Sequence, residues 1–138
     1  MARILIVEDE PLIAMMLSEW LEELGHQPIG PASTVDDAIA RIGQGAIDAA
    51  IVDINLCGRR SDPVAAALVE RSLPFAFATG DHADSVGDAY RDRPLIAKPY
   101  DFAAFANAVE ALIASPGRRH IAQDRDDTPA QLTGSTSV

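Results

Sequence analysis

Five polar residues are the groups in this sequence best placed to do chemistry, because each follows an apolar run of strand length. These residues are Glu8, Asp9, Asp53, Thr79 and Lys98. In a sheet of parallel strands connected by helices, the carboxyl ends of the strands meet at one edge, where ligands bind. We therefore expect three carboxylates, one hydroxyl and one ammonium group to lie together at that edge.

Three carboxylates at one edge repel one another unless a cation neutralises them. Mg²⁺ fits better than Ca²⁺, because Mg²⁺ accepts a few carboxylates, keeps several waters and leaves room for a phosphate oxygen. The sequence predicts a magnesium site formed by Glu8, Asp9 and Asp53, with the backbone carbonyl of Asn55 as a further ligand.

A carboxylate beside Mg²⁺, a hydroxyl and an ammonium group has the parts for phosphoryl transfer onto the carboxylate. Asp53 is the predicted nucleophile and would become an aspartyl phosphate. Thr79 would donate a hydrogen bond to one phosphoryl oxygen, and Lys98 would pair with another as a point charge. Lys98 is the single lysine among the 11 cationic residues of the chain. Taken singly, each residue also fits an ordinary cap, turn or surface position.

The hydrophobic pattern predicts the elements that must position these groups. Apolar runs of strand length alternate with stretches of helical periodicity, which is typical of a parallel α/β sheet. The predicted strands cover residues 3–7, 27–30, 49–52, 75–78 and 95–97. The predicted helices begin near Pro11, Thr34, Asp62 and Asp101, and a poor pattern over 82–92 predicts a short or mobile helix.

Specific positions are expected in the helices and the core. The first helix has an apolar stripe that includes Leu12 and Trp20, and the stripe of the second includes Ile39. Asp62 is expected to cap the third helix with its side chain. Four phenylalanines, together with Trp20, are expected in the core because they fall within strand and helix patterns; they are Phe75, Phe77, Phe102 and Phe105.

Composition sets limits on the class of protein. The chain has 138 residues, of which 48% are hydrophobic, and this favours one domain, which we place at residues 1–114. Residues 115–138 lack apolar periodicity and are expected to form a disordered tail. A formal charge of −10 argues against direct nucleic-acid binding. The single Cys57 cannot form an internal disulfide, and we find no signal peptide or membrane segment, so we expect a cytoplasmic protein without membrane insertion.

The constellation resembles the receiver domain of two-component response regulators, and the match covers residues 3–114. The matching residues are Glu8-Asp9 after the first strand, Asp53 with Asn55 two residues later, Thr79, and Lys98-Pro99. The resemblance implies a flavodoxin-like, doubly wound five-stranded parallel sheet of order 2-1-3-4-5 with helices on both faces.

The segment 74–80, Pro-Phe-Ala-Phe-Ala-Thr-Gly, resembles a receiver subgroup named for a Phe-Ala-Thr-Gly-X-Tyr motif and often found as stand-alone domains. Phe77 to Gly80 match the motif, whereas His82 occupies the position of its tyrosine. Leu95 stands three residues before Lys98, where most receivers have an aromatic switch residue.

By resemblance, a sensor histidine kinase phosphorylates Asp53, and the domain then switches the binding of an effector, feeds a phosphorelay or acts as a phosphate sink. Such a domain is a signalling switch rather than an enzyme, with slow autodephosphorylation at most. Asn55 and Asp81, each two residues after a site residue, border the path of the attacking water in receivers, so we expect them to set the phosphoryl lifetime.

Two other classes share this topology. A magnesium-dependent phosphatase that forms an aspartyl phosphate would want an acid two residues after the nucleophile, where this chain has Asn55. A flavin-binding domain would need a phosphate-cradling loop after the first strand, where this chain has Glu8-Asp9-Glu10-Pro11. Both differences favour the switch.

Overall fold

Strands rich in β-branched and small apolar residues form the centre of the molecule, which we describe from a computed structural model covering residues 1–80 and 93–114. Five strands form one parallel sheet in the order β2-β1-β3-β6-β7. They are β1 (Arg3–Val7), β2 (Gln27–Ala32), β3 (Ala49–Asp53), β6 (Phe75–Thr79) and β7 (Leu95–Ala97). Counted along the chain, this order is 2-1-3-4-5, so the predicted flavodoxin-like topology is confirmed.

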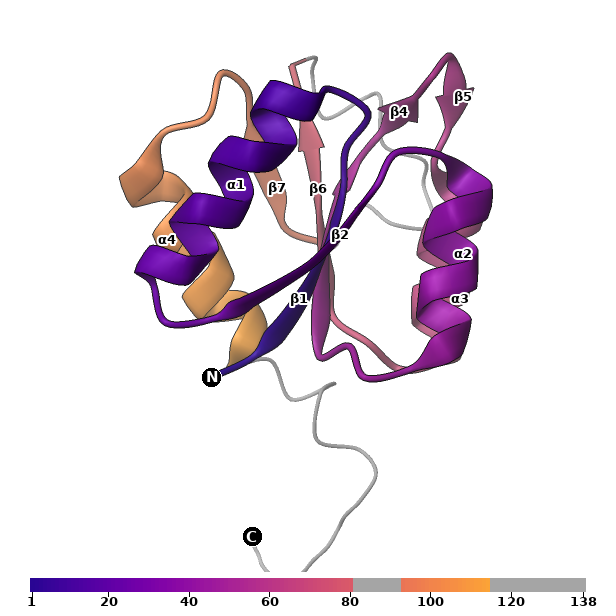
Figure 1. Ribbon diagram of the computed structural model, residues 1–138, viewed down its shortest axis with the longest axis horizontal. Helices are drawn as coiled ribbons and strands as arrows, with labels where there is room; N and C mark the ends of the chain where they lie inside the picture. Colours follow the sequence, from indigo (N-terminus) through magenta and orange to yellow (C-terminus); the bar gives the residue numbers. More distant parts are fainter. Residues whose placement is uncertain (81–92, 115–138) are drawn as a thin grey trace, which may run out of the picture.

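Among the described residues, two helices lie on each face of the sheet (Figure 1). Helices α1 (Pro11–Glu23) and α4 (Phe102–Ile113) pack on one face, and α2 (Val35–Gln44) and α3 (Asp62–Glu70) pack on the other. The strands alternate their side chains between these two layers, which explains why β3 and β6 are buried along their whole length.

The helix starts follow the capping chemistry of the sequence in two places. Thr34 accepts a hydrogen bond from the amide of Asp37 at 3.0 Å, and Asp101 accepts one from the amide of Ala104 at 3.0 Å. The predicted cap at Asp62 is wrong. Asp62 is the first residue of α3, no side chain caps that helix, and the Asp62 carboxylate instead contacts the guanidinium of Arg60 at 3.1 Å.

Some apolar side chains lie farther out than their periodicity predicted. Leu12 is 76% exposed, Ile39 and Phe102 are each 38% exposed, and Trp20 is half-buried. Leu12 and Phe102 lie in the first turns of their helices, and Ile39 borders the buried stripe of α2. The buried arc of each helix is therefore narrower than its apolar stripe. The predictions for Phe75, Phe77 and Phe105 are confirmed, since all three are buried.

We predicted a short or mobile helix over residues 82–92 and a disordered tail over residues 115–138. Both segments lie outside the described residues.

A bulge in the edge strand β2 bears directly on the position of Glu8. The pairing of β1 with β2 shifts register between Leu5 and Val7, opposite Gly30, which has a φ of +99°. Beyond the bulge, the carbonyl of Ala32 accepts a hydrogen bond from the amide of Glu8 at 3.0 Å. Glycine suits this place because a Cβ on Gly30 would lie 2.8 Å from the Ala32 nitrogen.

Gly30→Ala is expected to lower the free energy of unfolding by about 1–3 kcal/mol, because the added methyl meets backbone in a conformation that other residues rarely adopt. Gly43→Ala is the matched control. A Cβ there meets nothing within 4 Å, so in α2 this change should raise stability by up to about 0.5–1 kcal/mol. Urea unfolding measures both, and a Gly30→Ala protein as stable as the parent would contradict the role of the bulge.

Candidate functional site

The register of the sheet brings the predicted site residues to one edge. Asp53 and Thr79 are the last residues of β3 and β6, and Lys98 directly follows β7. Glu8 directly follows β1, which pairs with β3 up to Val7 opposite Val52. The sequence-based expectation that strand ends would gather these groups thus has a structural basis in the pairing of neighbouring parallel strands.

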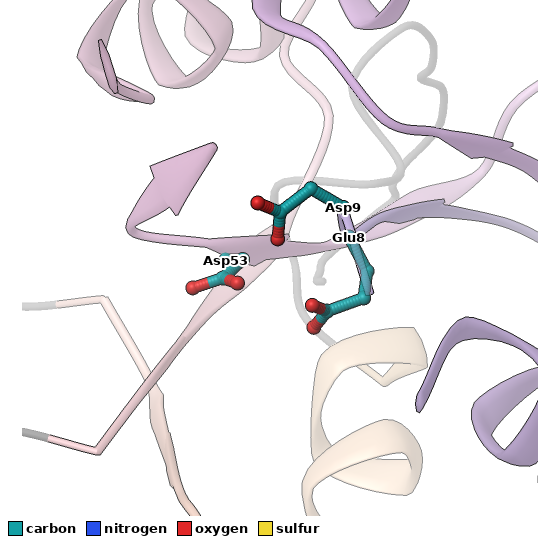
Figure 2. Close-up of side chains that lie close together, drawn as sticks. All are labelled: Glu8, Asp9 and Asp53. Carbon is teal, nitrogen blue, oxygen red and sulfur yellow. The ribbon is translucent and has the colours of Figure 1, made fainter. Parts of the chain in front are cut away.

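The three carboxylates lie close together. Oxygens of Glu8, Asp9 and Asp53 are all within 4.8 Å of one another, and Figure 2 shows the three side chains gathered around the ends of β1 and β3. Glu8 and Asp53 are buried, at 2% and 8% exposure, whereas Asp9 is half-buried. The group is therefore partly shielded from water and open on the side of Asp9.

Lys98 supplies the positive charge of this edge. Its Nζ donates a hydrogen bond to Asp53 Oδ2 at 3.1 Å and lies 3.6 Å from Glu8 Oε1. Burial lowers the pKa of Lys98, but the hydrogen bond and charge of Asp53 and the charge of Glu8 outweigh burial and raise it above its ordinary value. The ammonium group stays charged between the two carboxylates.

Glu8 is the carboxyl group most affected by its surroundings. Its pKa is raised to about 7, because burial and the negative charge of Asp53 outweigh the hydrogen bond from the Glu10 amide and the charge of Lys98, which lower it. Glu8 Oε2 accepts that bond at 3.2 Å, whereas buried Oε1 has no hydrogen-bond partner among the described residues. An additional cation beside Oε1 would satisfy it and favour the ionised carboxylate.

A short hairpin that we did not predict contacts the site. Strands β4 (Asn55–Leu56) and β5 (Arg59–Arg60) pair antiparallel through the two-residue loop Cys57-Gly58, in which both residues have positive φ. The Cys57 amide donates a hydrogen bond to Asp9 Oδ2 at 3.0 Å. A Gly in the second loop position is the usual signal for such a turn, but Asn or Asp is the common residue before it, and here Cys57 precedes it.

Ser61 is a second residue that the sequence reasoning missed. It is fully buried, and both its hydroxyl and its amide donate to the carbonyl of Ile54, at 3.0 and 2.8 Å. The Ile54 amide donates to the carbonyl of Ala78 at 3.2 Å. Ser61 thereby fixes the residue between Asp53 and Asn55. A serine just before a helix usually indicates a side-chain cap. The hydrogen bond to the Ile54 carbonyl could therefore not be predicted from the sequence.

Asn55 and Thr79 lie beside this group. The Asn55 amide donates to Asp53 Oδ1 at 3.4 Å, and Thr79 is buried with its carbonyl accepting the amide of Lys98 at 3.0 Å. That the Asn55 carbonyl is a metal ligand remains a prediction. Asp81 lies outside the described residues.

The donor set fits a hard divalent cation. All three side chains offer carboxylate oxygens, the ligand type that Mg²⁺ prefers, and one of these oxygens is buried without a hydrogen bond in the described part of the chain. Glu8, Asp9 and Asp53 are the residues that would hold the ion, and the half-buried Asp9 leaves the group accessible to solvent on one side.

A doubly wound parallel sheet with helices on both faces defines a flavodoxin-like domain, and here its carboxyl edge carries an acidic cluster. The model of the response regulator receiver domain family matches residues 4–110, and the chain belongs to this family. Membership places the chain in two-component signal transduction, among signalling switches that are generally not enzymes. None of the helices in the described part of the chain has the length and hydropathy to cross a membrane.

Three known proteins illustrate the relationship. The solution structure of SdrG from Sphingomonas melonis Fr1 is 53% identical with a TM-score of 0.73, covering 82% of this chain and 97% of that one. The phyllosphere-induced regulator PhyR of Methylorubrum extorquens is 38% identical over 102 residues, 70% of this chain but only 38% of PhyR. TrrA from Thermotoga maritima, solved with Mg²⁺-BeF, is 27% identical with a TM-score of 0.72, covering 81% of this chain and 99% of that one.

Replacing Lys98 by Gln is expected to tighten Mg²⁺ binding about tenfold, or about 1.4 kcal/mol, because the ammonium repels an incoming cation. Two unit charges 4 Å apart interact by roughly 4 kcal/mol at an effective dielectric constant of about 20. The expected gain in binding free energy is a fraction of that interaction energy. Isothermal titration with MgCl₂ measures the change. Arg41→Gln, which removes a cation paired with Asp37 on α2, should leave the affinity unchanged. Weaker binding in Lys98→Gln would contradict this electrostatic account.

Proposed function

We propose that this chain is a phosphorylation-controlled switch in which Asp53 accepts a phosphoryl group from a sensor histidine kinase. The observation that carries the proposal is the position of Asp53, a buried carboxylate within 4.8 Å of two others and 3.1 Å from the Lys98 ammonium. Membership of the receiver family supports this assignment.

In the proposed step, a carboxylate oxygen of Asp53 attacks the phosphorus of a phosphohistidine. A P–O bond forms and the P–N bond breaks. The electron pair of the broken bond stays on the imidazole nitrogen, and with a proton on its other nitrogen the ring leaves as neutral imidazole. The product is an aspartyl phosphate, an activated acyl phosphate.

The surrounding side chains would stabilise the charge of the transferring group. Mg²⁺ held by Glu8, Asp9, Asp53 and the Asn55 carbonyl would neutralise phosphoryl oxygens and relieve the repulsion between the carboxylates. The Thr79 hydroxyl would donate a hydrogen bond to one phosphoryl oxygen. Lys98, already 3.1 Å from Asp53, would pair with another.

Phosphorylation is proposed to change the binding of a partner, either an effector or another protein of a phosphorelay, or to drain phosphate from a kinase. A structure of SdrG is described as its BeF₃-activated conformation, and it is 53% identical to this chain with a TM-score of 0.71. That relative supports a two-state response here. We place the switch in residues 1–114, in the cytoplasm and in the motif subgroup described above.

The test is the intact mass of the protein after incubation with a small phosphodonor, with and without Mg²⁺. We expect a gain of one phosphoryl group that requires Mg²⁺ and is absent in Asp53→Asn. Asp36→Asn makes the same chemical change on an exposed residue of α2 and should be phosphorylated like the parent. Phosphorylation of Asp53→Asn would overturn the assignment of the acceptor.

The phosphatase alternative predicts repeated turnover of phosphate esters. Residue 55 is an exposed asparagine, which cannot protonate a leaving group as a carboxylic acid does. We therefore expect at most one phosphate released per Asp53 in a phosphate-release assay with an aryl phosphate and Mg²⁺. Many turnovers that disappear in Asp53→Asn would establish an enzyme instead of a switch.

A further inference from the structure

Besides its two carboxylate contacts, Lys98 has an aromatic ring as a neighbour. Lys98 Nζ lies over the ring of Tyr100 at 5.8 Å from the centroid, within the range of a cation–π interaction. The ammonium thus has three described neighbours: Asp53, Glu8 and this ring.

The packing of the core holds the ring of Tyr100 in place. Phe105, fully buried in α4, meets Tyr100 edge-on at 6.4 Å with an interplanar angle of 90°. Trp20 of α1 packs against Phe105 at 5.6 Å. The position of the Tyr100 ring therefore depends on the layer of α1 and α4 rather than on the ammonium group.

The phenol of Tyr100 also lies close enough to the site to be affected by its charges. Burial raises the pKa of Tyr100 above its ordinary value, and the negative charges of Glu8 and Asp53 raise it further. The phenol therefore stays neutral, and Tyr100 interacts with the Lys98 ammonium through its ring and not through a negative charge.

The three neighbours of Lys98 respond differently when the site is loaded. Mg²⁺ and a phosphoryl group would draw Glu8 and Asp53 into other interactions, and both carboxylates would release the ammonium. The Tyr100 ring takes no part in that exchange. A lysine side chain has many accessible rotamers, so a contact that does not depend on the ligand limits how far the freed ammonium moves.

We propose that Tyr100 is a positioning residue that holds the Lys98 ammonium beside the acidic site, so that it pairs with the phosphoryl oxygen when the carboxylates release it. This inference rests on the proposed function, because it names the residue that prepares Lys98 for the phosphoryl group. Tyr100 itself touches no reacting atom and acts through Lys98.

The first test needs no substitution, because Lys98 is the only lysine in the sequence. Labelling with ¹³C,¹⁵N-lysine gives one side-chain spin system. We expect nuclear Overhauser contacts between its ε-protons and the Tyr100 ring protons, in the free protein and again with Mg²⁺ and beryllofluoride. Loss of these contacts in the loaded state would overturn the proposal.

The second test measures the affinity for beryllofluoride at saturating Mg²⁺ by titration calorimetry. Tyr100→Leu is expected to weaken binding about two- to fivefold, the value of an exposed cation–π contact, whereas Tyr100→Phe keeps the ring and should restore the parent affinity. Phe102→Leu is the matched control, because Phe102 meets Trp20 at 5.3 Å and no contact with Lys98 is described.

A double-mutant cycle separates positioning from packing. In the Lys98→Gln background, Tyr100→Leu should have no further effect; an equal loss in both backgrounds would mean that Tyr100 only packs and would overturn the inference. A parent protein that binds no beryllofluoride with Mg²⁺ would overturn the proposed function itself, and the inference with it. Binding by the parent with no difference between Tyr100→Leu and Tyr100→Phe would overturn the inference alone.

Discussion

The ion pair between Lys98 and Asp53 partly offsets the repulsion among the carboxylates at the carboxyl edge of the sheet. Parallel strands deliver their carboxyl ends to one edge, and this chain places three carboxylates there, two of them buried. Buried charges without partners are costly, so the single ammonium 3.1 Å from Asp53 and 3.6 Å from Glu8 is essential in the absence of other cations. One positive charge does not balance three negative ones, and the remaining negative charge favours the binding of a cation at this edge.

Backbone hydrogen bonds between neighbouring strands hold the charged residues in place. The amide of Glu8 donates to Ala32 on β2, and the amide of Lys98 donates to Thr79 on β6. Glu8 and Lys98, which directly follow strands, are therefore anchored through their main chains, while their side chains contact each other at 3.6 Å. Asp9 differs, because its described hydrogen bond comes from Cys57 in the β4–β5 hairpin. The buried half of the site is thus built on the sheet, and the exposed half depends on a turn.

The sheet and its carboxyl edge were predictable from sequence, because hydrophobic periodicity and the polar residues that follow apolar runs are patterns that extend over many residues. Alternating apolar runs indicated the sheet, and polar residues after them indicated the edge. The missed features depend on single backbone geometries or tertiary partners. The Cys57-Gly58 turn lacks the usual Asn or Asp in its first position, and Ser61 donates to the Ile54 carbonyl instead of capping α3. The exposure of Leu12 follows from where α1 meets the sheet, which its own periodicity does not contain.

The aromatic ring described beside Lys98 does not come from the edge strand β7. Leu95, where most receivers have an aromatic residue, is 40% exposed on the edge strand β7 and has no ring to offer. The ring that meets Lys98 belongs to Tyr100, which contacts Phe105 and through it Trp20. Lys98 is thereby linked through the Tyr100 ring to the packed layer of α1 and α4. A response routed through that layer needs no rotating aromatic side chain on the edge strand, which is consistent with the residues this chain has there.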